Sequence, residues 1–216
     1  MKDYINGNLK MHNNLEYMEY LPSSFSPTKK YPLIIQLHGA GGRGFGDFEG
    51  YMNEYSIIRN LKQKEKFEFI VIAPHCIEDT WFDIFEQLKD FIQNMVCLPY
   101  VDQSRIYLSG VSMGGYTSWQ VLMSMPNLFS AAIICCGGGM YWNAGRIKTP
   151  VWAFHGLKDT VVFPEESLKM VNAVNCCGGK AKITLYENDD HNCWDSTYSN
   201  EQVFEWLLTN KKGKEV

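Results

Sequence analysis

One serine of this sequence has the neighbours that a nucleophile needs. Ser112 is the central residue of a G-x-S-x-G motif at residues 110–114. The apolar run Arg105–Ser109 precedes the motif and the helical stretch Met113–Met125 follows it, so the serine lies at a strand-to-helix turn. A turn of this kind exposes the serine oxygen, and the glycines allow neighbouring backbone to pass closely. Ser112 could instead only cap the helix, but the strand, serine and helix order favours nucleophilic attack on an acyl carbon.

A serine hydroxyl needs a base that takes its proton. His191 is the candidate, because it follows the apolar run Ile183–Tyr186 and precedes the last helical stretch, Glu201–Thr209. A base after the last strand agrees with the chain order serine, acid, histidine that accompanies G-x-S-x-G turns. The alternative is a solvated histidine in a loop.

A third group must orient the imidazole and stabilise its charged form. Asp159 follows the apolar run Val151–Phe154 and stands between the serine and the histidine in the chain. Asp189 and Asp190 are nearer to His191 in sequence but have the wrong place in that order, so they are the weaker candidates.

A glycine-rich segment supplies candidate donors for an oxyanion. The segment HGAGGRG at residues 38–44 directly follows the apolar run Leu33–Leu37. Acyl transfer needs two backbone N–H groups aimed at the developing negative charge. We expect these to belong to Met113, the residue after the nucleophile, and to Ala40. Phosphate binding is the competing interpretation, but the segment has neither G-x-G-x-x-G nor a G-K-[ST] ending.

The elements that must position these residues alternate along the chain. Short apolar runs, each too short for a typical helix, predict strands that are buried on both faces. They are Leu33–Leu37, Phe69–Ala73, Arg105–Ser109, Ala131–Cys135, Val151–Phe154 and Ile183–Tyr186. Helical stripes fall between them at Ile84–Cys97, Met113–Met125, Glu165–Val174 and Glu201–Thr209.

This alternation predicts an α/β fold, with a mainly parallel central sheet and helices on both faces. Leu15–Leu21 could add an antiparallel edge strand. Every reactive residue follows a predicted strand, at the end of the sheet where such folds bind ligands.

Length and charge restrict the remaining possibilities. A chain of 216 residues suits one domain, 1–216, and the net charge of −4 gives no basic excess for nucleic acid. Neither a secretory signal in the first residues nor a membrane span is predicted. The seven cysteines show no zinc-type spacing, so we expect no metal site, free thiols and a cytoplasmic location.

The stretches LHGAGGRG, DQSRIYLSGVSMGGYTSW, PVWAFHGLKDTVV and HNCWDSTYSNEQVFEWLL resemble the α/β-hydrolase superfamily. The similarity is greatest to its small esterases and "predicted peptidases", which are prolyl-oligopeptidase-like and related to feruloyl esterases and polyhydroxybutyrate depolymerases. The resemblance implies a sheet of eight strands or a trimmed version of it, no cofactor, and an acyl-enzyme on Ser112 with Asp159 and His191 as acid and base.

The function expected from these residues is that of a serine carboxylesterase acting on a small-molecule ester. A peptidase, thioesterase or acyltransferase would use the same three residues, and a non-catalytic binding protein of the same fold is a third option. Neither nucleic acid nor a membrane is an expected partner, and a homo-oligomer is left open.

The segment Gly137–Thr149 is too short for a helical lid domain, so we expect an open cleft. The aromatic residues Trp81, Trp142 and Trp194, with Tyr141, are the candidate walls of that cleft, because each follows a strand. Such walls favour a compact or flat aromatic acyl group.

Overall fold

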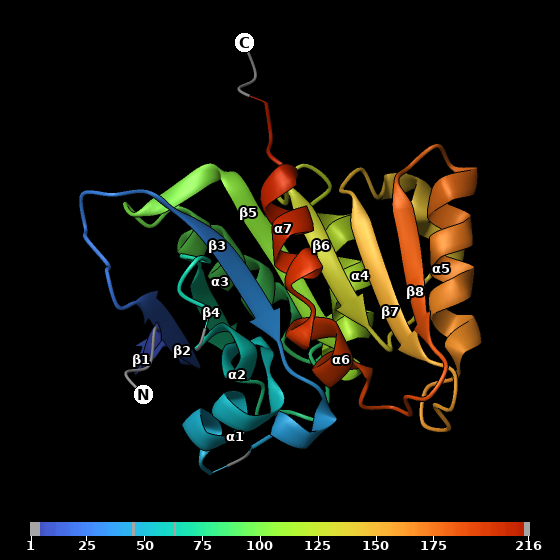
Figure 1. Ribbon diagram of the computed structural model, residues 1–216, viewed down its shortest axis with the longest axis horizontal. Helices are drawn as coiled ribbons and strands as arrows, with labels where there is room; N and C mark the ends of the chain where they lie inside the picture. Colours follow the sequence, from blue (N-terminus) through green and yellow to red (C-terminus); the bar gives the residue numbers. More distant parts are fainter. Residues whose placement is uncertain (1–4, 45, 63, 214–216) are drawn as a thin grey trace.

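A computed structural model describes residues 5–44, 46–62 and 64–213 (Figure 1). Eight strands form one sheet in the order β1-β2-β4-β3-β5-β6-β7-β8. Their bounds are β1 Ile5–His12, β2 Leu15–Pro22, β3 Tyr31–Leu37, β4 Ile70–Pro74, β5 Val101–Val111, β6 Ala131–Cys135, β7 Val151–Gly156 and β8 Ala181–Tyr186. From β4 to β8 across the sheet, neighbouring strands are parallel. The predicted mainly parallel sheet is thus confirmed.

The two N-terminal strands differ from the prediction. β2 is antiparallel, as expected, but it is not at the edge of the sheet, because β1 pairs with its outer side. Asn13 and Asn14 join the two strands with φ angles of 46° and 62°, and His12 is opposite Leu15. A two-residue turn with both φ angles positive is the common connection of a β-hairpin, and asparagine tolerates that conformation.

Helices cover both faces of the sheet, as predicted (Figure 1). One buried cluster packs α3 (Phe85–Val96), α4 (Met113–Ser124) and α5 (Pro164–Cys176) against the sheet. A second cluster on the other face packs α1 (Phe48–Tyr55), α2 (Ile57–Leu61), α6 (Cys193–Ser199) and α7 (Glu201–Thr209). Helices α1, α2 and α6 were not predicted.

The connection between β6 and β7 is short. Residues 136–150 contain only one short 3-10 helix, η2 (Tyr141–Arg146). This agrees with the expectation that the segment is too short to build a lid domain.

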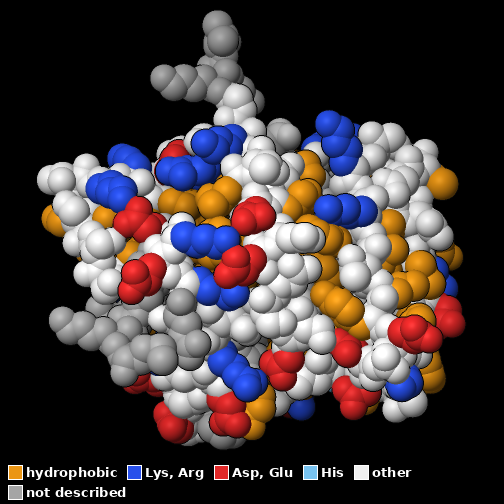
Figure 2. All heavy atoms as spheres, viewed as in Figure 1, with side chains coloured by type: hydrophobic (Ala, Val, Ile, Leu, Met, Phe, Trp, Pro, Cys, Tyr) orange, Lys and Arg blue, Asp and Glu red, His pale blue; other side chains and the backbone are white. Residues whose placement is uncertain are grey.

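The surface that faces the viewer in Figure 1 carries side chains of both signs, interspersed with one another (Figure 2). Among the described residues, no helix has both the length and the apolar character needed to cross a bilayer.

Candidate active site

Ser112 occupies a strained turn between β5 and α4. Its φ and ψ angles are 51° and −116°, a conformation that residues with a side chain rarely adopt. Its N–H donates to the carbonyl of Cys135 at 3.0 Å, which holds the turn against the end of β6. The turn also needs Gly114, because a Cβ there would lie 2.3 Å from the carbonyl oxygen of Leu37 on β3. The G-x-S-x-G spacing therefore reflects close packing of backbone on both sides of the serine.

The structure brings the three residues of the predicted triad together. His191 Nε2 lies 2.9 Å from Ser112 Oγ, and His191 Nδ1 lies 2.7 Å from Asp159 Oδ2. The carboxylate requires that Nδ1 carries the proton, which leaves Nε2 free to accept one from the serine hydroxyl. Asp190, a competing acid, accepts the N–H of Asn192 instead.

Asp159 is held by the turn that follows β7. Its Oδ1 accepts the N–H groups of Val161 and Val162, each at 2.9 Å, and its side chain is fully buried. Burial raises the pKa of the carboxyl group, but the hydrogen bonds from His191, Val162 and Val161 outweigh burial and lower the pKa below its ordinary value. The acid therefore stays charged although its side chain is buried.

A second histidine contacts the same carboxylate. His155, the fifth residue of β7, is fully buried, and its Nε2 lies 2.8 Å from the carbonyl of Val162 and 3.2 Å from Asp159 Oδ2. A carbonyl only accepts, so Nε2 donates its proton to both oxygens. The other nitrogen, Nδ1, lies 2.7 Å from Ser167 Oγ on α5. His155 thus braces Asp159 against β7 and α5, which the sequence analysis did not predict.

The loop that carries His191 packs against the end of β7. Leu157 N donates to the carbonyl of Tyr186 at 2.9 Å, and Lys158 N donates to the carbonyl of Asp189 at 3.0 Å. Gly156 lies under this loop so closely that a Cβ would be 2.2 Å from the carbonyl oxygen of Asp190. The position of the imidazole therefore depends on the absence of a side chain at Gly156.

The glycine-rich segment lies beside the serine. A Cβ on Gly39 would be 3.5 Å from Ser112 Cβ, and Ala40 begins the 3-10 helix η1 (Ala40–Gly42) directly afterwards. Met113 is the first residue of α4, so its N–H is one of the groups that a helix leaves without an internal partner. Both predicted oxyanion donors therefore lie in segments that adjoin Ser112.

Buried side chains hold the glycine-rich segment 38–44 in place. Burial lowers the pKa of His38 to about 4, so its imidazole is neutral, and its Nε2 accepts the N–H of Cys76 at 3.0 Å. Trp81 donates its indole N–H to the carbonyl of His38 at 3.0 Å and is fully buried. The expectation that Trp81 forms a wall of an open cleft is therefore wrong, because its ring packs in the core and supports the loop.

The other two tryptophans differ in their surroundings. The ring of Trp194 meets the ring of His191 edge-on, with 5.7 Å between the centroids. Trp142 is 72% exposed and contacts Tyr141 in the same geometry. Their contribution to substrate binding stays a prediction.

An apolar cavity begins one helical turn from the serine. It has a volume of about 500 Å³, and its lining is formed by Phe82, Phe85, Tyr116, Gln120, Gly139 and Met140. Tyr116 is on α4, and its N–H donates to the carbonyl of Ser112 at 3.0 Å. None of the three predicted tryptophans is among these six residues. The sequence offered no signal for this cavity, because its walls come from three separate segments.

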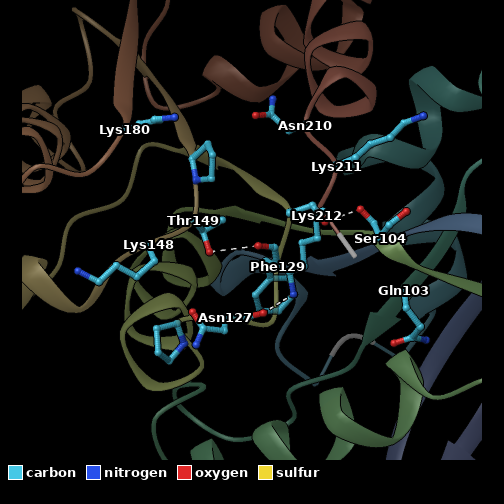
Figure 3. A pocket seen from close by; sticks show the side chains of 14 residues that line it. Gln103, Ser104, Asn127, Phe129, Lys148, Thr149, Lys180, Asn210, Lys211 and Lys212 are labelled. Carbon is cyan, nitrogen blue, oxygen red and sulfur yellow. Dashed lines mark hydrogen bonds between the residues drawn. The ribbon is translucent and has the colours of Figure 1, made fainter. Parts of the chain in front are cut away.

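A larger cavity, of about 760 Å³, lies at the opposite end of the sheet (Figure 3). Its walls are formed mostly by lysine and uncharged polar side chains near the amino ends of β5 to β8, with Lys212 across its centre and Thr149 donating to the carbonyl of Phe129. It holds no nucleophile with an adjacent base, so size alone does not identify the reactive site.

Comparison with solved structures agrees with this fold. A thermostable esterase superposes on 97% of the chain with a TM-score of 0.83 and 30% identity, and the chain covers 64% of that structure. The chain has the α/β-hydrolase fold. An acylaminoacyl peptidase of Pyrococcus horikoshii, at 15% identity and a TM-score of 0.73, shares the same fold.

Sequence comparisons show similarity of this chain to both esterases and peptidases. Residues 76–144 match the prolyl oligopeptidase family. Feruloyl esterase C of Emericella nidulans is 22% identical in an alignment of 168 positions that covers 74% of this chain and 60% of that protein. Dipeptidyl-peptidase 5 of Porphyromonas gingivalis is 22% identical in an alignment of 223 positions that covers 79% of this chain and 32% of the peptidase. The chain thus spans about 60% of the length of the feruloyl esterases that it matches.

Proposed function

We propose that this α/β-hydrolase is a serine hydrolase that cleaves carboxylic esters through an acyl-enzyme on Ser112. The observation that carries the proposal is the unbroken hydrogen-bond chain from Ser112 through His191 to Asp159, with the serine on a strained turn. The buried carboxylate holds the histidine in the tautomer that can accept the serine proton, so this geometry suits a general base.

The proposed reaction has two acyl-transfer steps. His191 Nε2 takes the proton of Ser112 Oγ while the oxygen attacks the ester carbonyl, and the N–H groups of Ala40 and Met113 donate to the oxyanion. The intermediate collapses, and the alcohol leaves with the proton that His191 returns. Water then attacks the acyl-serine by the same route, which releases the carboxylic acid and restores the hydroxyl. Asp159 stabilises the imidazolium that forms in each step.

The proposed substrate is an ester with a small or flat aromatic acyl group. The apolar cavity beside Tyr116 supports this, because a volume of about 500 Å³ accommodates an aromatic ring but leaves a long alkyl chain partly in water. Trp142 and Trp194 are further candidates for contacts with the leaving group. The similarity to feruloyl esterases supports an aromatic acyl group.

A peptidase is the second candidate, and the match to the prolyl oligopeptidase family favours it. The two functions share the acyl-serine and differ in the leaving group, an alcohol or an amine. A panel of p-nitrophenyl esters, hydroxycinnamate esters and peptide anilides would rank them by kcat/KM. Higher kcat/KM on anilides than on matched esters would reject the esterase proposal.

Labelling with a fluorophosphonate tests the nucleophile directly. We expect one covalent adduct, on Ser112, in the wild-type protein and none in Ser112→Ala. Ser109→Ala is the matched control and should still be labelled. Ser109 is a buried serine on β5, and its hydroxyl bonds to Tyr198 at 2.8 Å and not to a histidine. Labelling that survives Ser112→Ala, or is absent from the wild type, would refute the proposal.

We also propose that the described residues form one catalytic domain that acts in a reducing, cytoplasmic compartment. The free thiols support this location: four of the seven cysteines are buried, and none is in a disulfide. Non-reducing mass spectrometry of the purified protein tests it, since a stable bridge would contradict a reducing compartment.

A further inference from the structure

A cysteine beside the triad has no part in the proposed reaction. Cys136 follows β6 with a φ angle of 42°, the left-handed region that a residue with a side chain seldom occupies. Its N–H donates to the carbonyl of Phe154 at 2.9 Å, and its side chain is fully buried. A strained residue next to a reactive site is a reason to look for a function of its side chain.

The thiol of Cys136 is close to two members of the triad, the buried Asp159 and the partly exposed His191. One ligand atom each from Cys136, His191 and Asp159 lies within 4.8 Å of the other two. Sulfur, imidazole nitrogen and carboxylate oxygen are the three donor types that bind zinc in proteins. The three donors come from the ends of β6, β7 and β8, so their spacing in the sequence gave no sign of a metal site.

We propose that Cys136, His191 and Asp159 form an inhibitory binding site for a borderline or soft divalent cation such as Zn²⁺. The metal replaces one proton, that of the Cys136 thiol, because the imidazole binds in its neutral form and the carboxylate is already charged. The thiol of Cys136 loses its hydrogen ion to solvent when it binds the metal, whereas the neutral imidazole of His191 keeps its single proton on the nitrogen that does not bind the metal. Asp159 adds a bond to the metal, and it gives up its hydrogen bond from His191 only if the metal takes Nδ1. No electron is transferred.

Metal binding at this site prevents His191 from acting as a base. If the metal takes Nε2, the lone pair that accepts the serine proton is occupied. If it takes Nδ1, the remaining proton moves to Nε2, which then cannot accept another. The ion is therefore an inhibitor that competes with the hydrogen-bond chain of the triad. The inhibition rests on the proposed hydrolase function, whereas the binding of the metal does not.

Hard cations should not bind here. Mg²⁺ and Ca²⁺ prefer sets of oxygen ligands, and this site offers one carboxylate. Lower pH should weaken the binding of Zn²⁺, because hydrogen ions compete for the thiol and the imidazole.

Cobalt spectroscopy tests the binding without any assay of activity. We expect Co²⁺ added to the wild-type protein to give a thiolate-to-metal charge-transfer band. The band should vanish in Cys136→Ser and persist in Cys135→Ser, a matched control in which the neighbouring buried thiol lies outside the three-ligand set. His191→Gln, which changes a partly exposed loop residue, should weaken Co²⁺ binding about tenfold or more and does not depend on folding of the cysteine variant. A missing band in the wild type, or a band that survives Cys136→Ser, would overturn the inference.

Zinc inhibition then connects the site to activity. We expect Zn²⁺ to slow p-nitrophenyl acetate hydrolysis reversibly, EDTA to restore it, and Mg²⁺ to have no effect. The inhibitory concentration, measured against each variant's own metal-free rate, should rise about tenfold or more in Cys136→Ser and stay unchanged in Cys135→Ser. Equal inhibition of both variants would refute the assignment of Cys136. A cobalt band in a protein without hydrolase activity would instead reject the proposed function and leave the metal site standing.

Discussion

The substitution Gly156→Ala should damage catalysis through one methyl group. Gly156 ends β7, and a Cβ at this position would lie 2.2 Å from the carbonyl oxygen of Asp190 and 2.4 Å from that of Asp189. Both oxygens belong to the backbone of the loop that carries His191, so neither can rotate away as a side chain would. The loop must therefore retreat by roughly 1 Å, which is enough to lengthen the contact from His191 to Ser112. A misplacement of about 1 Å costs on the order of 100-fold in rate.

The assay is kcat/KM on p-nitrophenyl acetate, with the unfolding temperature measured in parallel. We expect a loss of about 100-fold with a cost of about 1–3 kcal/mol in the free energy of unfolding, which is typical of an overpacked site. Gly145→Ala is the control, because a Cβ there meets only the side chain of Cys177, at 3.6 Å. Wild-type kcat/KM in folded Gly156→Ala would show that the loop position does not limit catalysis and would refute this reasoning.

Four further predictions concern the same site. Asp159→Asn should lower kcat about 10⁴-fold because the amide supports the wrong tautomer, whereas Asp190→Asn should change it little; the opposite ranking would reassign the acid. Activity should fall as pH decreases, because His191 must be neutral to take the Ser112 proton. The lowered pKa of Asp159 keeps that carboxylate charged over about pH 7 to 5, so Asp159 does not cause this loss of activity. If the residual activity of His191→Ala still falls with decreasing pH in the same way, the assignment of His191 as the base is contradicted. His155→Gln, which keeps a donor, should retain about tenfold more kcat than His155→Leu at similar KM, and equal values would reject the bracing contact. On p-nitrophenyl esters, kcat/KM should peak at roughly C2 to C6 acyl chains, and a steady rise through C12 would indicate a longer groove.

The side chains that the structure brings together could be predicted because each follows a strand of a parallel sheet. Ser112, Asp159 and His191 come after β5, β7 and β8, and the carboxyl ends of parallel strands meet at one edge. The apolar runs thus predict the strands, and the strand ends predict where in the fold these three side chains lie. Their order in the chain then separated Asp159 from Asp189 and Asp190.

Features that depend on contacts between distant segments were missed. β1 reads INGNLKMH, which lacks a continuous apolar run, and its Asn-Asn turn is a weaker hairpin signal than Asn-Gly. Trp81 follows a strand just as an active-site residue would, and only the structure shows its ring under the loop. The contact of His155 with Asp159 and the apolar cavity likewise appear only when β7, α4 and the flanking loops are assembled.

Asp159 has a consequence for the choice of an inactive control protein. Its two oxygens receive four donors, namely two backbone N–H groups at Oδ1 and two imidazole N–H groups at Oδ2. An asparagine in either orientation points its NH₂ group at two of these donors, so no rotamer satisfies them all. The unpaired buried groups should cost about 1–3 kcal/mol, and the turn that begins α5 should loosen together with the imidazole. A variant at this position therefore confounds lost chemistry with altered structure. Ser112→Ala removes one hydroxyl and leaves the four hydrogen bonds to Asp159 in place. It is therefore the better inactive reference for binding, labelling and crystallographic trapping of substrates.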